Sequence, residues 1–150
     1  MLFAFIVAIG VILVDQWVKL WTISTLALHE SQAGIAGIFD FYYIRNEGAS
    51  WGILAGQRTL FIVLTFAVVA YLMYVLVKEK QLPFSQKIVY GLLLGGAVGN
   101  LIDRLRWGYV VDMFRLTFIE FPIFNVADIA LSLGAVALFG LLMFAKEEKA

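Results

Sequence analysis

Four long apolar segments constrain what this 150-residue chain can fold into. A helix rises about 1.5 Å per residue, so about 20 apolar residues cross a hydrocarbon core of about 30 Å. Apolar residues make up 63 % of the chain and charged residues 15 %, which is far from the composition of a soluble domain. We therefore predict an all-α membrane protein, a single domain over residues 1–150, with transmembrane helices over residues 2–23, 59–77, 88–105 and 123–145.

The charged residues predict how these helices are oriented. Lysines gather in "KEKQLPFSQK", between the second and third spans, and in the tail "KEEKA". The positive-inside rule makes both segments cytoplasmic, and four spans then place both chain termini on the cytoplasmic side. The first apolar segment lacks a basic leader, so we interpret it as a retained span. Five arginines fall on the opposite side: Arg45, Arg58, Arg104, Arg106 and Arg115. We expect some of these five to belong to a functional site.

Composition excludes several classes of chemistry. The chain has no cysteine and one histidine, His29, so thiolate catalysis and multi-histidine metal sites are excluded, and we expect no cofactor. The net charge is zero and no basic stripe is present, so we expect no nucleic-acid partner. His29 is interpreted as a solvated loop residue.

Two further patterns indicate local structure. The segment "AGIAGIFDFYYIRNEGASWGIL" mixes glycine with β-branched and aromatic residues, which predicts short strands or an interfacial sheet in the external segment between the first and second helices. In the third span Gly91, Gly95 and Gly99 repeat every four residues, a pattern typical of closely packed membrane helices. At the end of that helix, Asn100 is three and four residues from Asp103 and Arg104.

Two aspartates stand out beside the fourth span. Asp128 lies one helical turn after Asn125 and one before Ser132, and Asp112 ends the extended pattern "WGYVVD", sixteen residues upstream. If the chain reverses between them, the two carboxyls meet near the membrane surface. Close carboxylates share a proton, and one acid with one base can activate water against a carbonyl, as in aspartic proteases. The alternative is that each aspartate pairs with an arginine or caps a helix.

Two other groups are weaker candidates. Asp15 and Lys19 are four residues apart and predict a structural ion pair, with proton relay or ion binding as the alternative. "GASWG" matches the G-x-S-x-G pattern of serine hydrolases at Ser50, but the strand and helix that this motif requires are not indicated. His29 is the only histidine, so a Ser50–Lys19 dyad is the version left open.

Four blocks carry a family resemblance: "DQWVK", "RNEGASWGIL", "GGAVGNLIDRLRWGYVVDMF" and "FPIFNVADIALSLG". In this order the chain resembles the lipoprotein signal peptidases, also called signal peptidase II. The resemblance implies a multi-pass aspartic protease of the bacterial inner membrane, with its active site toward the extracytoplasmic face and without metal. It also implies cleavage of prolipoproteins just before a cysteine that carries diacylglycerol, contact with membrane lipid, and inhibition by globomycin-type cyclic peptides. We expect a monomer.

The resemblance also implies roles for residues of this sequence. The catalytic pair is Asp112 and Asp128. The residues implied around the pair and the substrate are Asn46, Gly48, Asn100, Arg104 and Asn125, with supporting roles for Asp15, Lys19 and Asp103. The segment around residues 30–55 would form the sheet and lid. The alternative function is a small proton- or ion-coupled carrier that uses Asp15, Asp112 and Asp128.

Overall fold

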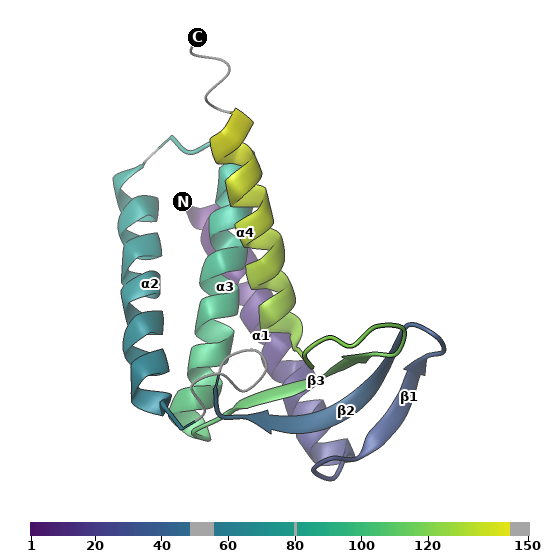
Figure 1. The fold of residues 1–150 in the computed structure, drawn as a ribbon. Helices are drawn as coiled ribbons and strands as arrows, with labels where there is room; N and C mark the ends of the chain where they lie inside the picture. Colours follow the sequence, from purple (N-terminus) through teal and green to yellow (C-terminus); the bar gives the residue numbers. More distant parts are fainter. Residues whose placement is uncertain (49–55, 80, 145–150) are drawn as a thin grey trace.

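The computed structural model describes residues 1–48, 56–79 and 81–144. Its helices are α1 (Leu2–Thr25), α2 (Arg58–Lys78), α3 (Phe84–Arg106) and α4 (Val126–Phe144), and each is long and apolar enough to cross a membrane. The prediction of four helices that could each cross a membrane is therefore confirmed. The start of α1 and the end of α4 lie at the same end of the bundle, opposite the sheet (Figure 1).

The starts of α3 and α4 differ most from the predicted boundaries, for local reasons. α3 begins at Phe84, four residues earlier than predicted, because Pro83 occupies its N-cap position and the polar turn that follows is still helical. α4 begins at Val126, three residues later than predicted. The residues before it stay extended because the backbone of Phe124 is hydrogen-bonded with that of Phe114.

α3 is the central helix of the bundle, and α1, α2 and α4 all pack against it. A Cβ added at Gly91 would lie 2.7 Å from a backbone oxygen of α1, and one at Gly95 would lie 2.8 Å from another. A Cβ at Gly96 would lie 2.6 Å from the carbonyl oxygen of Ala127 in α4. The glycines therefore allow α1 and α4 to reach the backbone of α3, which confirms the predicted packing role.

A three-stranded antiparallel sheet caps one end of the bundle (Figure 1). The strands β1 (Ser31–Ile35) and β2 (Phe39–Asn46) follow α1, as predicted, and β3 (Val110–Leu116) comes from the segment between α3 and α4. Leu26, Tyr43, Val111 and Met113 form a buried cluster under the sheet. This cluster fixes β3, and with it Asp112, against the end of α1.

The arginines near the sheet have separate roles. Arg58 donates hydrogen bonds to the carbonyls of Arg104 and Leu105 in the last turn of α3, and so ties the start of α2 to the end of α3. Arg115 forms an ion pair with Asp40 across β2 and β3 at 3.1 Å. Arg58 and Arg115 therefore have structural contacts that account for their position at the sheet end of the molecule.

Candidate active site

Asp128 lies in the first turn of α4 and forms a reciprocal cap with Asn125. The backbone N–H of Asp128 donates to Asn125 Oδ1 at 2.9 Å, and the backbone N–H of Asn125 donates to Asp128 Oδ2 at 3.2 Å. This is a capping box, with Asn and Asp in place of the usual Ser or Thr and Glu. The cap fixes the start of α4 and the direction of the Asp128 carboxyl together.

Asp112 lies on β3, directly opposite Ile44 of β2. Side chains two residues apart on a strand share a face, so Asn46 points to the same side of the sheet as Ile44 and its partner Asp112. Asn46 Nδ2 donates to Asp112 Oδ2 at 2.9 Å, and Asn125 Nδ2 donates to Asp112 Oδ1 at 2.7 Å. Asp112 is only 1 % exposed, and each of its carboxyl oxygens accepts a hydrogen bond from an amide group.

The surroundings of Asp112 favour its protonated form. Burial, and next the negative charge of Asp128, raise the pKa of Asp112 from 3.8 to about 7, although the hydrogen bonds from Asn46 and Asn125 oppose the rise. A carboxyl with this pKa exchanges its proton near neutral pH, which suits a residue that must give a proton and take it back.

Asn125 brings the two aspartates to one place. Its side-chain amide donates to Asp112 and to Asn100 Oδ1, while its backbone and its Oδ1 bind Asp128. Asn100 completes the arrangement, because its Nδ2 donates to Asp128 Oδ1 at 2.8 Å. The chain between the two acids therefore does reverse, and both carboxyls contact the same asparagine. Asp128 also caps the start of α4, as the structural alternative predicts for it, whereas the Asp112 carboxyl is bound by two asparagine side chains.

A buried ionic cluster supports this arrangement from α1. The Lys19 ammonium lies 2.9 Å from Asp15 Oδ2 and 3.0 Å from Asp103 Oδ2, and the three side chains are at most 2 % exposed. Asp15 Oδ1 accepts the backbone N–H of Ala127 at 2.8 Å, and Asp103 Oδ2 accepts that of Val111 at 3.0 Å. The predicted ion pair between Asp15 and Lys19 is confirmed. The Asp15 carboxylate holds the first turn of α4 in place, and the Asp103 carboxylate holds the start of β3.

Sequence reasoning missed Gln16 in this cluster. Its Nε2 donates to Asp103 Oδ1 at 2.9 Å and to the carbonyl of Gly99 at 3.2 Å. The signal was present, because Gln16 lies inside the block "DQWVK". Among the described residues, no buried side-chain nitrogen or oxygen lacks a hydrogen-bond partner.

Arg104 connects the acids to the segment that follows β2. Its guanidinium donates to the carbonyl of Gly48 at 3.2 Å and lies over the ring of Phe61 at 4.9 Å. The backbone N–H of Gly48 donates to Asn46 Oδ1 at 2.9 Å, which turns Asn46 Nδ2 toward Asp112. Arg104 thus fixes Gly48, and Gly48 fixes the amide that covers Asp112.

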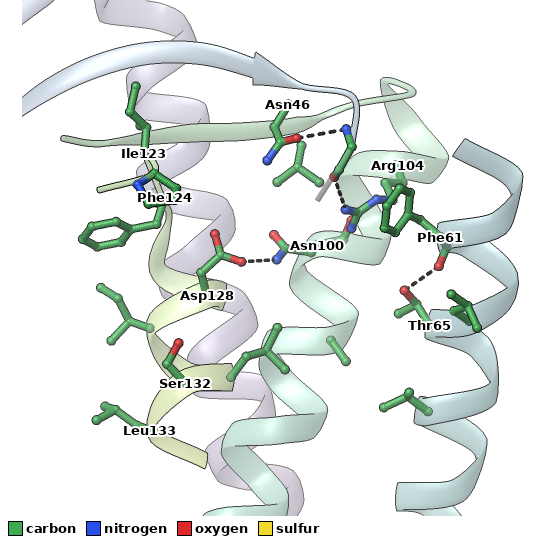
Figure 2. A pocket seen from close by; sticks show the side chains of 18 of the residues that line it. Asn46, Phe61, Thr65, Asn100, Arg104, Ile123, Phe124, Asp128, Ser132 and Leu133 are labelled. Carbon is green, nitrogen blue, oxygen red and sulfur yellow. Dashed lines mark hydrogen bonds between the residues drawn. The ribbon is translucent and has the colours of Figure 1, made fainter. Parts of the chain in front are cut away.

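A cavity of about 650 Å³ opens beside Asp128, between α2 and α4. Figure 2 shows the polar groups Asn46, Asn100, Arg104 and Asp128 at its sheet end and Leu133 farther along α4. Several apolar side chains that line it are exposed, so the cavity is open and not enclosed: Leu64, Val68, Ile129 and Leu133. The cavity is therefore reachable from the side of the bundle that faces lipid.

Comparison with known proteins identifies the family. The family model described as signal peptidase (SPase) II matches residues 7–144. The chain belongs to the signal peptidase II family. This membership makes it a membrane-embedded protease and confirms the resemblance seen in the sequence, and it is consistent with the removal of signal peptides from prolipoproteins.

Similarity to individual proteins agrees with this family assignment. It is 41 % identical over 134 residues to a lipoprotein signal peptidase of Streptococcus thermophilus strain CNRZ 1066, covering 89 % of this chain and 86 % of the relative. It is 38 % identical over 135 residues to that of Enterococcus faecalis strain V583, covering 90 % and 84 %. None of these relatives supports the carrier alternative.

A solved structure of a bacterial membrane enzyme, determined by the in meso method at 2.3 Å resolution, matches this signal peptidase II chain with a TM-score of 0.93 and 32 % identity. The match covers 98 % of this chain and 91 % of that one. A second, at 1.9 Å resolution, matches with a TM-score of 0.85 and 33 % identity, covering 93 % and 91 %. The four-helix fold with its small sheet is thus shared with solved membrane enzymes.

His29 lies apart from the site of this signal peptidase II chain. His29 is exposed in the turn between α1 and β1, as predicted, with φ of 67° and its ring beside Tyr42. Ser50, with the rest of residues 49–55 of the segment predicted to form the sheet and lid, lies outside the described residues. Within the described ranges, no group of three or more His, Asp or Glu side chains could hold a metal ion.

Proposed function

We propose that this chain is an aspartic endopeptidase, a single membrane-embedded domain that removes the signal peptide from diacylglyceryl-modified prolipoproteins. In this proposal Asp112 and Asp128 are the catalytic pair, and the enzyme cuts the peptide bond just before the lipidated cysteine. The observation that carries the proposal is the shared contact with Asn125, which holds one carboxyl with a pKa near 7 beside a second, partly buried carboxyl.

The chemistry follows from the surroundings of the two acids. Asp128 lines the cavity, so as the charged partner it accepts a proton from a water placed there. That water attacks the scissile carbonyl carbon, and Asp112 gives its proton to the carbonyl oxygen. The C–N bond then breaks, and the leaving amine takes the proton that Asp128 received from the water. Asp112 regains its proton from a hydroxyl of the tetrahedral intermediate as the new carboxylic acid forms. The net reaction consumes one water and yields one acid and one amine.

Substrate must reach Asp112 for this step. Asn46 covers Asp112 Oδ2, and Asn46 is in turn held by the backbone of Gly48. A substrate carbonyl would therefore replace the Asn46 amide at Asp112, which frees that amide to bind the substrate backbone. The side chains of Asn100 and Arg104 line the same cavity and offer further donors to an extended peptide.

The cavity suits a lipid-anchored precursor. Its apolar wall opens sideways between α2 and α4, so a hydrophobic signal segment and acyl chains can enter without leaving the bilayer. The polar end of the cavity lies beside the sheet, at one end of the spanning helices (Figure 2). A diacylglycerol group would hold the cysteine at this depth, which places the bond to be cut next to Asp128.

Location and partners are proposed with the function. The enzyme lies in the bacterial inner membrane as a monomer, with the site toward the extracytoplasmic face and both termini in the cytoplasm, as the lysine distribution predicts. Globomycin-type cyclic peptides should compete with the precursor for the cavity. No cofactor enters the reaction.

The test is cleavage of a diacylglyceryl-modified precursor by purified enzyme in detergent micelles. We expect the wild type to release a product that begins at the lipidated cysteine. Asp112→Asn and Asp128→Asn should each be folded and reduce kcat by at least about 10⁴-fold, because neither half of the acid–base pair works alone. Full turnover by both variants would refute the assignment of the pair, and equal cleavage of an unlipidated precursor would refute the substrate class.

A further inference from the structure

Lys19 is a buried cation close to the catalytic pair, and the reaction proposed above does not use it. Its side chain is 2 % exposed, and its ion pairs with Asp15 and Asp103 alone would make it a structural residue. A third contact of Lys19 points toward the site and not toward the ionic cluster. The Lys19 ammonium also donates to Asn100 Oδ1 at 2.9 Å, and Asn100 reaches the site.

The two ends of the Asn100 amide face opposite kinds of partner. Its oxygen accepts from Lys19 and from Asn125 Nδ2, at 2.9 and 3.1 Å. Its nitrogen donates to Asp128 Oδ1 at 2.8 Å. If the amide turned over, its NH₂ would meet an ammonium and another NH₂, and its oxygen would meet a carboxylate. All three contacts would become repulsive, so the donors at the oxygen end fix which end faces Asp128.

We propose that Lys19 is a positioning residue for Asp128 and acts through Asn100. Its positive charge holds the Asn100 amide in the one orientation that donates to the carboxylate, and so fixes Asp128 Oδ1. The second oxygen of Asp128 is held by the backbone of Asn125. Because a hydrogen bond holds each oxygen of the Asp128 carboxylate, its remaining lone pairs face the cavity in one fixed geometry. This inference rests on the proposed function, because it assumes that Asp128 is the base.

The positioning role predicts a particular kinetic signature. Lys19 lies behind Asn100 and is almost fully buried, so substrate does not touch it. Its removal should therefore lower kcat and leave KM nearly unchanged. We expect Lys19→Met to reduce kcat by about 10- to 100-fold, the effect of losing one well-placed bond to a charged group, with KM within about threefold.

A double-mutant cycle separates this role from a structural one. The second position is Asn100→Leu, which keeps the shape of the side chain and removes both ends of the amide. If Lys19 acts through Asn100, Lys19→Met should change kcat by less than about twofold when the Asn100→Leu substitution is already present. Single-turnover cleavage with enzyme in excess measures the slow rates that this comparison requires.

Stability gives the matched control within the same four proteins. Lys19→Met leaves the carboxylates of Asp15 and Asp103 without their cation whether or not the Asn100 amide is present. The unfolding midpoint should therefore fall by a similar amount in both backgrounds, while kcat falls in only one. If Lys19→Met does not fold, the cycle is repeated with Lys19→Met/Asp103→Asn, which removes the excess buried charge.

The outcomes are distinguishable. An equal loss of kcat from Lys19→Met in the wild-type and Asn100→Leu backgrounds, or an unchanged kcat in the wild-type background, overturns the positioning role. Neither result affects the catalytic pair, which fails only if Asp112→Asn and Asp128→Asn remain active. A loss of kcat that is confined to the wild-type background, with KM retained, supports the inference.

Discussion

Burial of Asp112 should make the stability of the protein depend on pH, and Asp112→Asn should remove that dependence. In the folded protein the pKa of Asp112 is about 7, against an ordinary value of 3.8, so the folded state binds more protons between these values. The stability associated with Asp112 is then fully present below about pH 4 and is lost as pH rises through about 7. The full difference corresponds to about 4 kcal/mol, and more than half of it falls between about pH 5 and about pH 8.

Asparagine cannot ionise, so its effect at this position is the same at every pH. Its NH₂ would face an NH₂ of Asn46 or Asn125, a constant cost of about 1–3 kcal/mol. Relative to the wild type, Asp112→Asn should therefore gain about 2 to 3 kcal/mol between about pH 5 and about pH 8, whatever its starting stability. The prediction concerns this slope, and the constant offset does not enter it.

Unfolding in detergent micelles, followed by tryptophan fluorescence, measures the difference between the two proteins at each pH. Other titrating groups largely cancel in that difference, although Asp128 interacts with Asp112, so the slope belongs to the pair. A second comparison in the Asp128→Asn background should show a smaller slope, because one cause of the raised pKa of Asp112 is gone. A flat difference, or a gain toward acid pH, would refute the reasoning.

Three further predictions use other parts of the structure. Turnover should fall as pH rises through about 7, when Asp112 loses its proton. Asn46→Leu should move this fall in turnover to higher pH, because the Asn46 hydrogen bond lowers the pKa of Asp112. A fall at the same pH in both proteins would argue against Asp112 as the acid. Gly95→Ala should lower the free energy of unfolding by about 1–3 kcal/mol because the added Cβ meets α1. The matched helical substitution Gly10→Ala has open space around it and should be neutral or stabilising. Equal effects of the two substitutions in unfolding titrations would contradict the packing role. Ser50→Ala should keep the wild-type kcat in the precursor assay, and loss of turnover would revive the serine alternative.

The spanning helices could be predicted because their signal is local. Hydropathy over about 20 residues and the four-residue spacing of Gly91, Gly95 and Gly99 can both be read without knowledge of the fold. The boundaries were less predictable. The start of α4 depends on Phe124 pairing with Phe114 and on the cap by Asn125, which are contacts between an extended segment, a strand and a helix end.

The site was predictable in its residues and not in its connections. The spacing of Asp112 and Asp128 allowed a meeting, but the sequence did not show that Asn125 would contact both. The spacing of Asp15 predicted its ion pair with Lys19 but not its contact with α4. Its bond to the backbone of Ala127 joins residues 112 positions apart, and no local pattern encodes a contact of that range.

The central claim is that Asp112 and Asp128 share one proton near neutral pH, and infrared spectroscopy of the carboxyl groups measures this most directly. Difference spectra against Asp112→Asn should show a protonated carboxyl band in the wild type that titrates near pH 7. The corresponding band should titrate at lower pH in Asp128→Asn, because the neighbouring charge has been removed. A wild-type enzyme in which both carboxyls are ionised at about pH 6, or a band that does not respond to Asp128→Asn, would contradict the account.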